Sequence, residues 1–168
     1  MAKYLKENNE EIFKDHLFSM YVTLGVSKTF SGSFDESNKT LKELFKFEPD
    51  NYSTMYDLGF AYYYISCNYY YLGDYIKSLE ELNKGISCMN QTDDIGGQLF
   101  LEQRKAFVQY TTKNNEDALT TIEKCLKLYK KIDDKEGEAL AMLSKFDYLS
   151  RTDRNKAYDY IDFLLVHS

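Results

Sequence analysis

Residues that could support acid–base or metal chemistry are few in this sequence. Its two histidines, His16 and His167, lie near opposite ends of the 168 residues, and neither belongs to an H-E-x-x-H or similar metal-ligand spacing. Adjacent carboxylates such as Glu80 and Glu81 fit the solvent-facing side of a helix, and nothing in the sequence marks a paired acid and base in a cleft. We therefore expect a non-catalytic protein with no metal site and no cofactor.

Two related segments, TDDIGGQLFL and IDDKEGEALA, suggest phosphate or calcium binding at first sight. Gly96-Gly97 lacks the preceding strand and following lysine of a phosphate loop, however, and neither segment has the alternating ligands and distal glutamate of an EF-hand. Asp94 and Asp134 are instead typical helix N-caps, with Gly97 or Gly137 in the first turn of the next helix.

Composition limits the compartment and the partners. Cys67, Cys88 and Cys125 are odd in number and lack CxxC spacing, which favours buried, reduced thiols. The N-terminus has no apolar signal core, and no stretch reaches the roughly 18 apolar residues of a membrane span. The net charge of −6 disfavours direct contact with nucleic acid, and the lysines of KCLKLYKK fit a solvated helix face. These features predict a cytoplasmic protein without a nucleic-acid or membrane partner.

The elements that position the side chains repeat along the chain. A single proline in 168 residues favours helices over many short strands. Four small residues recur at spacings of 41, 40 and 39, and each is followed four positions later by an aliphatic residue: Ser37 and Leu41, Ser78 and Leu82, Ala118 and Ile122, Ala157 and Ile161. Periods of 20–50 residues are typical of helical or β-solenoids.

The repeated residues resemble the tetratricopeptide repeat (TPR) family, whose motif combines aromatics and L-G on a first helix with A-x-x-x-F on a second and a trailing proline. The first copy has Lys28 at the second aromatic position, and the period is near 40 instead of 34, as in bacterial signalling regulators with longer helices. The matching residues are Tyr21, Leu24, Gly25, Ser37, Leu41 and Pro49 in copy one; Tyr62, Ile65, Ser66, Tyr69, Ser78 and Leu82 in copy two; Ala106, Ala118 and Ile122 in copy three; and Tyr148, Ala157 and Ile161 in copy four.

The resemblance implies an all-α solenoid of helical hairpins, with about four repeats and eight helices in one domain over residues 1–168. The repeats run roughly over 8–48, 49–91, 92–132 and 133–168, and the helices near 8–30, 34–47, 51–71, 75–89, 94–112, 116–131, 135–150 and 154–166. Gly25, Ser66 and Ala106 are expected where a first helix touches its partner, and Gly32 and Gly73 in tight turns.

A concave binding groove lined by the first helices is also implied. Tyr62 and Tyr69 occupy packing positions, so we expect them to be mostly core. The implied groove residues are Val22, Val26, Phe30, Tyr63, Tyr70, Tyr71, Phe107, Tyr110, Met142 and Phe146, and Thr29, Cys67, Gln103 and Leu149 occupy the remaining groove-facing positions. The alternative is that the lengthened helices bury this apolar face. The Lys and Asn residues of a carboxylate clamp are missing, and Asn68 is one position away from a groove asparagine.

We therefore expect a protein- or peptide-binding scaffold in cytosolic signalling or assembly. The alternative is a sensor or regulatory fragment of a larger transcription regulator or signalling enzyme, which an open reading frame continuing past Ser168 would indicate. The apolar run Phe163, Leu164, Leu165 and Val166 cannot be hidden by one helix face, so either a following segment or a second copy should cover it, the latter giving a homodimer through the C-terminal helix.

Overall fold

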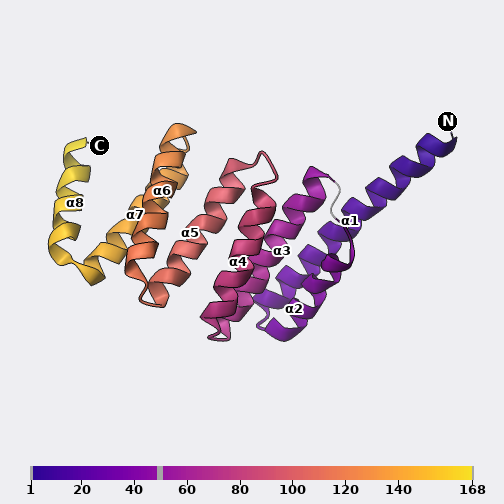
Figure 1. Ribbon diagram of the computed structural model, residues 1–168, viewed down its shortest axis with the longest axis horizontal. Coiled ribbons are helices and arrows are strands. Elements are labelled where there is room, and N and C mark those ends of the chain that lie inside the picture. Colours follow the sequence, from indigo (N-terminus) through magenta and orange to yellow (C-terminus); the bar gives the residue numbers. More distant parts are fainter. Residues whose placement is uncertain (1, 49–50, 168) are drawn as a thin grey trace. The chain divides into compact units, whose positions relative to one another are not determined.

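The protein is helical throughout the part that the structure describes. The computed structural model describes the backbone of residues 2–48 and 51–167 and the side chains of residues 13–48 and 51–166, and no strand occurs among them. The helices shown in Figure 1 are α1 (Ala2–Phe30), α2 (Phe34–Lys42), α3 (Tyr52–Tyr71), α4 (Tyr75–Met89), α5 (Ile95–Thr111), α6 (Asn115–Lys131), α7 (Lys135–Thr152) and α8 (Arg154–His167). The prediction of an all-α repeat fold with eight helices is confirmed.

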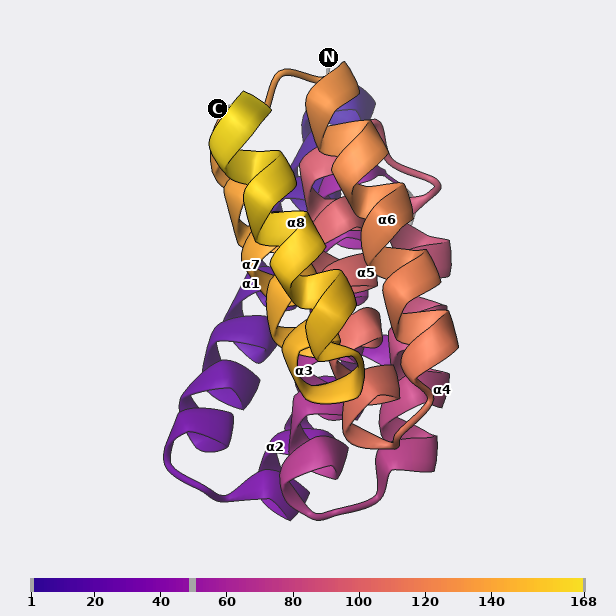
Figure 2. The same cartoon turned by 90° about the vertical axis from the view of Figure 1, so that its left-hand side faces the viewer.

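The chain forms two compact units, Met1–Gln98 and Leu99–Ser168. The first contains α1 to α4 and the start of α5, and the second contains the rest of α5 with α6 to α8. Short turns join α1 to α2 and α3 to α4 in antiparallel hairpins, which Figure 2 shows from the side. The predicted single domain stays a prediction, and Pro49 lies outside the described residues.

One helix ends earlier than its pattern predicts. Helix α2 stops at Lys42, and Glu43–Lys46 continues as a 3-10 turn instead of the α-helix expected to residue 47. Tightening of this kind is common at helix ends. It leaves Leu44 fully buried, while the Phe45 ring stacks on Tyr62 with centroids 4.6 Å apart. Packing against α3 therefore decides the geometry of this turn.

The small residues lie where the two helices of a hairpin touch, as predicted. Gly25 is buried on α1, and its carbonyl oxygen accepts a hydrogen bond of 2.8 Å from Ser37 Oγ on α2. In the next hairpin, the hydroxyl groups of Ser66 and Ser78 form a hydrogen bond of 2.9 Å. Ala106 and Ala118 are fully buried in the third. The helices approach so closely that larger side chains have no room there.

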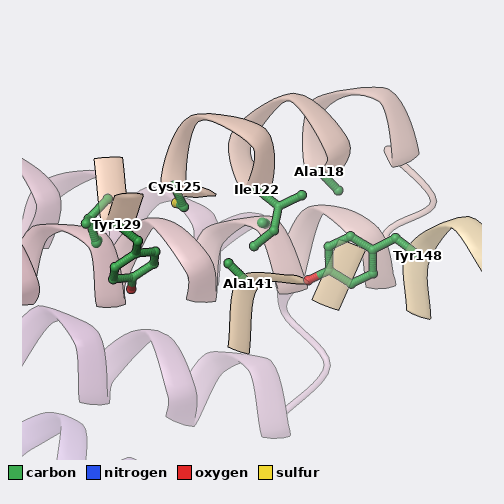
Figure 3. Close-up of a cluster of buried hydrophobic side chains, with 8 residues drawn as sticks. Ala118, Ile122, Cys125, Tyr129, Ala141 and Tyr148 are labelled. Carbon is green, nitrogen blue, oxygen red and sulfur yellow. The ribbon is translucent and has the colours of Figure 1, made fainter. Parts of the chain in front are cut away.

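Each unit has its own apolar core. Phe18, Leu41, Leu44, Leu58, Ala61, Ile65 and Cys88 form the core of the first unit. Figure 3 shows part of the second, where Ala118, Ile122, Cys125 and Tyr129 of α6 face Ala141 and Tyr148 of α7; Leu99 and Ala106 complete that cluster. Side chains from consecutive helices thus bury one another, as the repeat pattern requires.

The predicted helix caps are present. Asp94 Oδ1 accepts a hydrogen bond of 3.0 Å from Gly97 N, and Asp134 Oδ1 accepts one of 2.9 Å from Gly137 N. Both carboxylates therefore satisfy amide groups that the first turn of a helix leaves without partners. Capping is the role of these two aspartates, which were weighed above against calcium binding.

Three hairpin turns share one backbone conformation but not one residue type. Gly32 and Gly73 lie two residues beyond the ends of α1 and α3, with φ of +79° and +81°, and Lys113 lies two residues beyond the end of α5, with φ of 62°. Backbone hydrogen bonds close each turn. Gly73 N donates to Tyr70 O in the second hairpin, and Lys113 N donates to Tyr110 O in the third, both at 3.0 Å. A side chain is disfavoured in this left-handed region, so Lys113 is strained where its repeat equivalents are not.

Replacing Lys113 with glycine should stabilise the protein. We expect Lys113→Gly to raise the free energy of unfolding by about 0.5–1 kcal/mol, since relief of strain outweighs the greater freedom of the unfolded chain. Urea denaturation would measure the change. Lys127→Gly, at an exposed position inside α6, is the matched control and should cost about 1 kcal/mol. A Lys113→Gly variant that is no more stable than the parent would contradict the assignment of strain.

Candidate functional site

One concave surface of the first unit runs between α1 and α3. It consists of two adjoining pockets, one of 290 Å³ near the hairpin turn and one of 280 Å³ farther along the helices. Tyr64 lines both, so the pockets form one continuous surface, the α1–α3 groove. Its lining residues are Thr29, Phe30, Gly32, Phe34, Tyr63, Tyr64, Cys67 and Tyr71 in the first pocket, and Val22, Thr23, Val26, Tyr56, Asp57, Phe60 and Tyr64 in the second.

Most of the residues predicted for the groove in this unit are brought together there. Val22 and Val26 line the second pocket, and Phe30, Tyr63 and Tyr71 line the first. The exposed fraction is 81% for Phe30 and 62% for Tyr71, so these rings are accessible to a ligand. Phe30 and Tyr71 thus lie on an open surface of this unit, whereas Tyr63 and Tyr64 are half-buried.

Three tyrosines differ from the prediction in their location or burial. Tyr70 is half-buried, and its ring packs 5.7 Å from Tyr71 and 5.4 Å from Tyr75, near the turn between α3 and α4. Tyr62 and Tyr69 lie at the rim of the core and are half-buried, less enclosed than predicted. The Lys42 ammonium group on α2 and the Lys77 ammonium group on α4 lie 5.8 and 5.4 Å from the centre of the Tyr69 ring, where they can make cation–π contacts.

The remaining predicted residues belong to the second unit. Phe107 on α5 is partly exposed, with the Arg104 guanidinium 4.9 Å from its ring centre. Tyr110 stacks on Tyr148 of α7 at 4.3 Å and packs against the core. Met142 and Phe146 are half-buried on α7. Tyr110 is therefore chiefly a packing residue, whereas Phe107 is partly exposed beside Arg104.

Several groove residues escaped the sequence analysis. These residues lie before or between the motif positions from which the groove was predicted: Tyr56, Asp57, Phe60 and Tyr64. Tyr56, Phe60 and Tyr63 are spaced four and three residues apart, which places them on one face of α3. That spacing could have predicted Tyr56 and Phe60 as groove residues, because they share a helix face with Tyr63. The proximity of Asp57 to α1 was not visible in sequence, because it depends on how the hairpins pack.

Asp57 is the group of the groove whose ionisation the structure perturbs most. Burial, reinforced by the negative charge of Asp15 on α1, raises its pKa from 3.8 to about 6. Asp15 itself accepts a hydrogen bond of 3.1 Å from Asn51 Nδ2. Among the described residues, Asp57 has no hydrogen bond and no ion pair. This half-buried carboxylate therefore lies in a largely apolar pocket, and no cation among the described residues is paired with it.

This carboxylate should make stability depend on pH. Because the folded state binds the Asp57 proton more tightly than the unfolded chain, its charge destabilises the protein above about pH 6, and the penalty disappears as the pH falls towards 4. Asp57→Asn should therefore raise the free energy of unfolding by about 1 kcal/mol at pH 7.5, after allowance for solvent screening, and by almost nothing at pH 4.

Urea denaturation of parent and variant across this pH range would test the prediction. Asp35→Asn, at an exposed position on α2, is the matched control and should give no such gain. An Asp57→Asn variant that is no more stable than the parent at pH 7.5 would contradict a destabilising carboxylate.

Asn68 has a structural role and does not line either pocket. It is fully buried on α3, and its Nδ2 donates hydrogen bonds to Ser37 Oγ at 2.9 Å and to Asn38 Oδ1 at 2.8 Å on α2. Ser37 in turn contacts Thr29 Oγ1 at 2.9 Å and Gly25 O at 2.8 Å. This polar network links the first hairpin to the second and explains an asparagine just beyond the groove.

The cysteines are buried, as predicted. Cys67, Cys88 and Cys125 are free thiols with little exposure. Burial raises the pKa of Cys88, and burial together with the charge of Glu102 raises the pKa of Cys125 to about 12. Such thiols remain protonated and are poor nucleophiles.

Two further properties concern the described residues as a whole. No group of three His, Cys, Asp or Glu side chains among them is arranged to hold a metal ion. None of the described helices combines the length and the apolar character that crossing a bilayer requires.

The end of α8 is apolar and exposed. The exposed fraction is 51% for Phe163, 75% for Leu165 and 77% for Val166, while Leu164 is half-buried. The expectation that one helix face cannot hide this run agrees with these values. The homodimer through α8 stays a prediction.

Comparison with known proteins places the fold. No protein-family model matches the sequence, and no curated protein sequence matches it either. A structure search finds the crystal structure of a Podosopora anserina protein assigned as a kinesin light chain with nearly identical TPR-like repeats. Its sequence is 10% identical to this one, and the two structures superpose with a TM-score of 0.54 over 89% of this chain and 93% of that chain. This chain has the TPR-like repeat fold. A single-substitution variant of the same protein matches with a TM-score of 0.54, covering 91% of this chain and 94% of that chain, also at 10% identity.

The TPR-like fold accounts for the features described above. Long repeats close to 40 residues, compared with 34 in the standard motif, extend α1 and α3 and thereby lengthen the α1–α3 groove. At 10% identity the similarity establishes the arrangement of helices and leaves the ligand to be inferred from the groove itself.

Proposed function

We propose that this protein is a non-catalytic scaffold of cytosolic signalling or assembly that binds an unstructured peptide or a helical segment in the α1–α3 groove. The observation that carries the proposal is the pair of adjoining pockets of 290 and 280 Å³, which share Tyr64. A continuous groove with apolar walls and a few polar groups is the usual form of a peptide site.

The chemistry of the walls supports a protein ligand. Phe34 and Tyr71 stack at 5.4 Å, and Phe30 stands exposed beside them, so a partner side chain can bury a large apolar area. Tyrosine hydroxyls at the edge of such a surface can hydrogen-bond to the backbone of the ligand. Accessible aromatics of this kind often dominate binding energy in protein interfaces.

Selection from a random dodecapeptide library displayed on phage, followed by fluorescence anisotropy of the selected peptides, would test the proposal. Phe30→Ala should weaken binding by about tenfold without changing the thermal melt, because the ring is 81% exposed. Ile76→Ala, which removes an equally accessible apolar side chain on α4 outside the groove, is the control and should leave affinity unchanged. Failure to select any peptide, or equal binding by parent and Phe30→Ala, would refute this function.

A further inference from the structure

The pocket that contains Asp57 differs in character from the rest of the α1–α3 groove. The pocket near the hairpin turn is lined by aromatic, small and hydroxyl side chains, whereas the second pocket combines apolar side chains with a carboxylate. Asp57 has neither a hydrogen bond nor an ion pair within the described part of the chain. A ligand that supplies a cation would therefore pair with a carboxylate that has no partner among the described residues.

The negative potential at this pocket comes from more than one residue. Asp15, on the opposite helix α1, is close enough to influence the ionisation of Asp57. Burial, with a smaller contribution from the negative charge of Asp94, raises the pKa of the Tyr56 phenol in the pocket wall. The net charge of −6 adds a long-range attraction for cations. An acidic ligand group would be repelled from this pocket.

The aromatic walls suit the same type of ligand. Tyr56 and Phe60 lie 4.8 Å apart and are inclined at 48°, and Tyr63 and Tyr64 meet edge to face at 5.0 Å. The faces of aromatic rings attract ammonium and guanidinium groups. Val22 and Val26 from α1 supply the apolar contact that the methylene groups of a long basic side chain require.

We infer that the second pocket binds a lysine or arginine side chain of the peptide partner. This inference rests on the proposed function. Its aliphatic stem lies between Val22, Val26 and the rings of α3, and its charged end pairs with Asp57. The same peptide places an apolar side chain in the adjoining pocket beside Phe30. The ligand is thus an unstructured or helical segment that combines a basic residue with a neighbouring apolar one.

The test is selection of the dodecapeptide library on three proteins: the parent, Asp57→Asn and Asp35→Asn. Both variants remove one negative charge, but Asp35 is exposed on α2 and lines neither pocket, so it controls for net charge. Peptides selected on the parent and on Asp35→Asn should be enriched in lysine or arginine, and those selected on Asp57→Asn should not. A selected basic peptide should lose about tenfold in affinity for Asp57→Asn, and a similar amount when its basic residue is replaced by norleucine.

Each outcome is decisive. Selected peptides without basic residues, or basic peptides that bind Asp57→Asn and the parent equally, would overturn the inference and leave the proposed function standing. Loss of binding in both aspartate variants would assign the effect to net charge and also overturn it. A parent protein that selects no peptide would overturn the proposed function and this inference together. Thermal melts confirm that each variant is folded, and Asp57→Asn should be at least as stable as the parent.

Discussion

Replacing Gly25 with leucine should lower the free energy of unfolding by about 3 kcal/mol. Gly25 is buried on α1, and a Cβ atom at this position would overlap the side chain of Leu41 on α2, which is itself fully buried. The helices cannot separate easily, because Ser37 Oγ donates a hydrogen bond of 2.8 Å to the Gly25 carbonyl. The added side chain therefore breaks the contact that defines the first hairpin.

Thermal and urea denaturation would measure this effect. Ser27→Leu is the matched control, since Ser27 is exposed two residues farther along the same helix, and the change should be within about 0.5 kcal/mol. Gly25→Ala should also destabilise the protein, although alanine favours helices more than glycine does. If Gly25→Leu melts at the same temperature as the parent, the two helices are not in contact at this residue.

Removal of the Asn68 side chain should cost about 2–3 kcal/mol. Asn68→Ala deletes two buried hydrogen bonds, to Ser37 Oγ at 2.9 Å and to Asn38 Oδ1 at 2.8 Å, and leaves a cavity between α2 and α3. Asn38 then retains a buried acceptor that has lost its donor. Asn68 Oδ1 has no partner among the described residues, so the loss is smaller than for a fully satisfied amide.

A double-mutant cycle would show whether the network acts as a unit. Asn83→Ala, at an exposed position on α4, is the control and should change stability by less than about 0.5 kcal/mol. Asn68→Ala and Ser37→Ala should be non-additive by about 1 kcal/mol, because they share a hydrogen bond. Additive effects would mean that Asn68 contributes through packing alone.

Asp57 illustrates how stability and binding can oppose each other in one residue. Its uncompensated carboxylate is expected to destabilise the free protein and to hold the basic side chain of the inferred ligand. The variant Asp57→Asn should consequently gain stability and lose binding. Such opposition is common where a site must be prepared before its ligand arrives.

The sequence by itself determined the helices, their pairing and the positions where they touch. The spacing of Ser37, Ser78, Ala118 and Ala157 was sufficient for this, because a small residue is required at every close crossing and the requirement recurs with each repeat. The turn glycines and the two aspartate caps were equally readable, since backbone conformation and unpaired amide groups depend on nearby residues only. Lys113 shows the limit of this local prediction, because a lysine does not indicate the left-handed backbone conformation that the glycines at Gly32 and Gly73 do.

Only the tertiary structure decided which aromatic and polar side chains became core, network or groove. Tyr63 and Tyr71 line the groove and Tyr70 packs at the turn, although all three belong to α3. Asn68 forms hydrogen bonds with Ser37 and Asn38, which lie 31 and 30 positions earlier in the sequence. The negative charge of Asp15, on another helix, acts on Asp57. Burial and electrostatic environment arise from contacts between hairpins far apart in sequence, so periodicity predicts the face of a helix but not what that face meets.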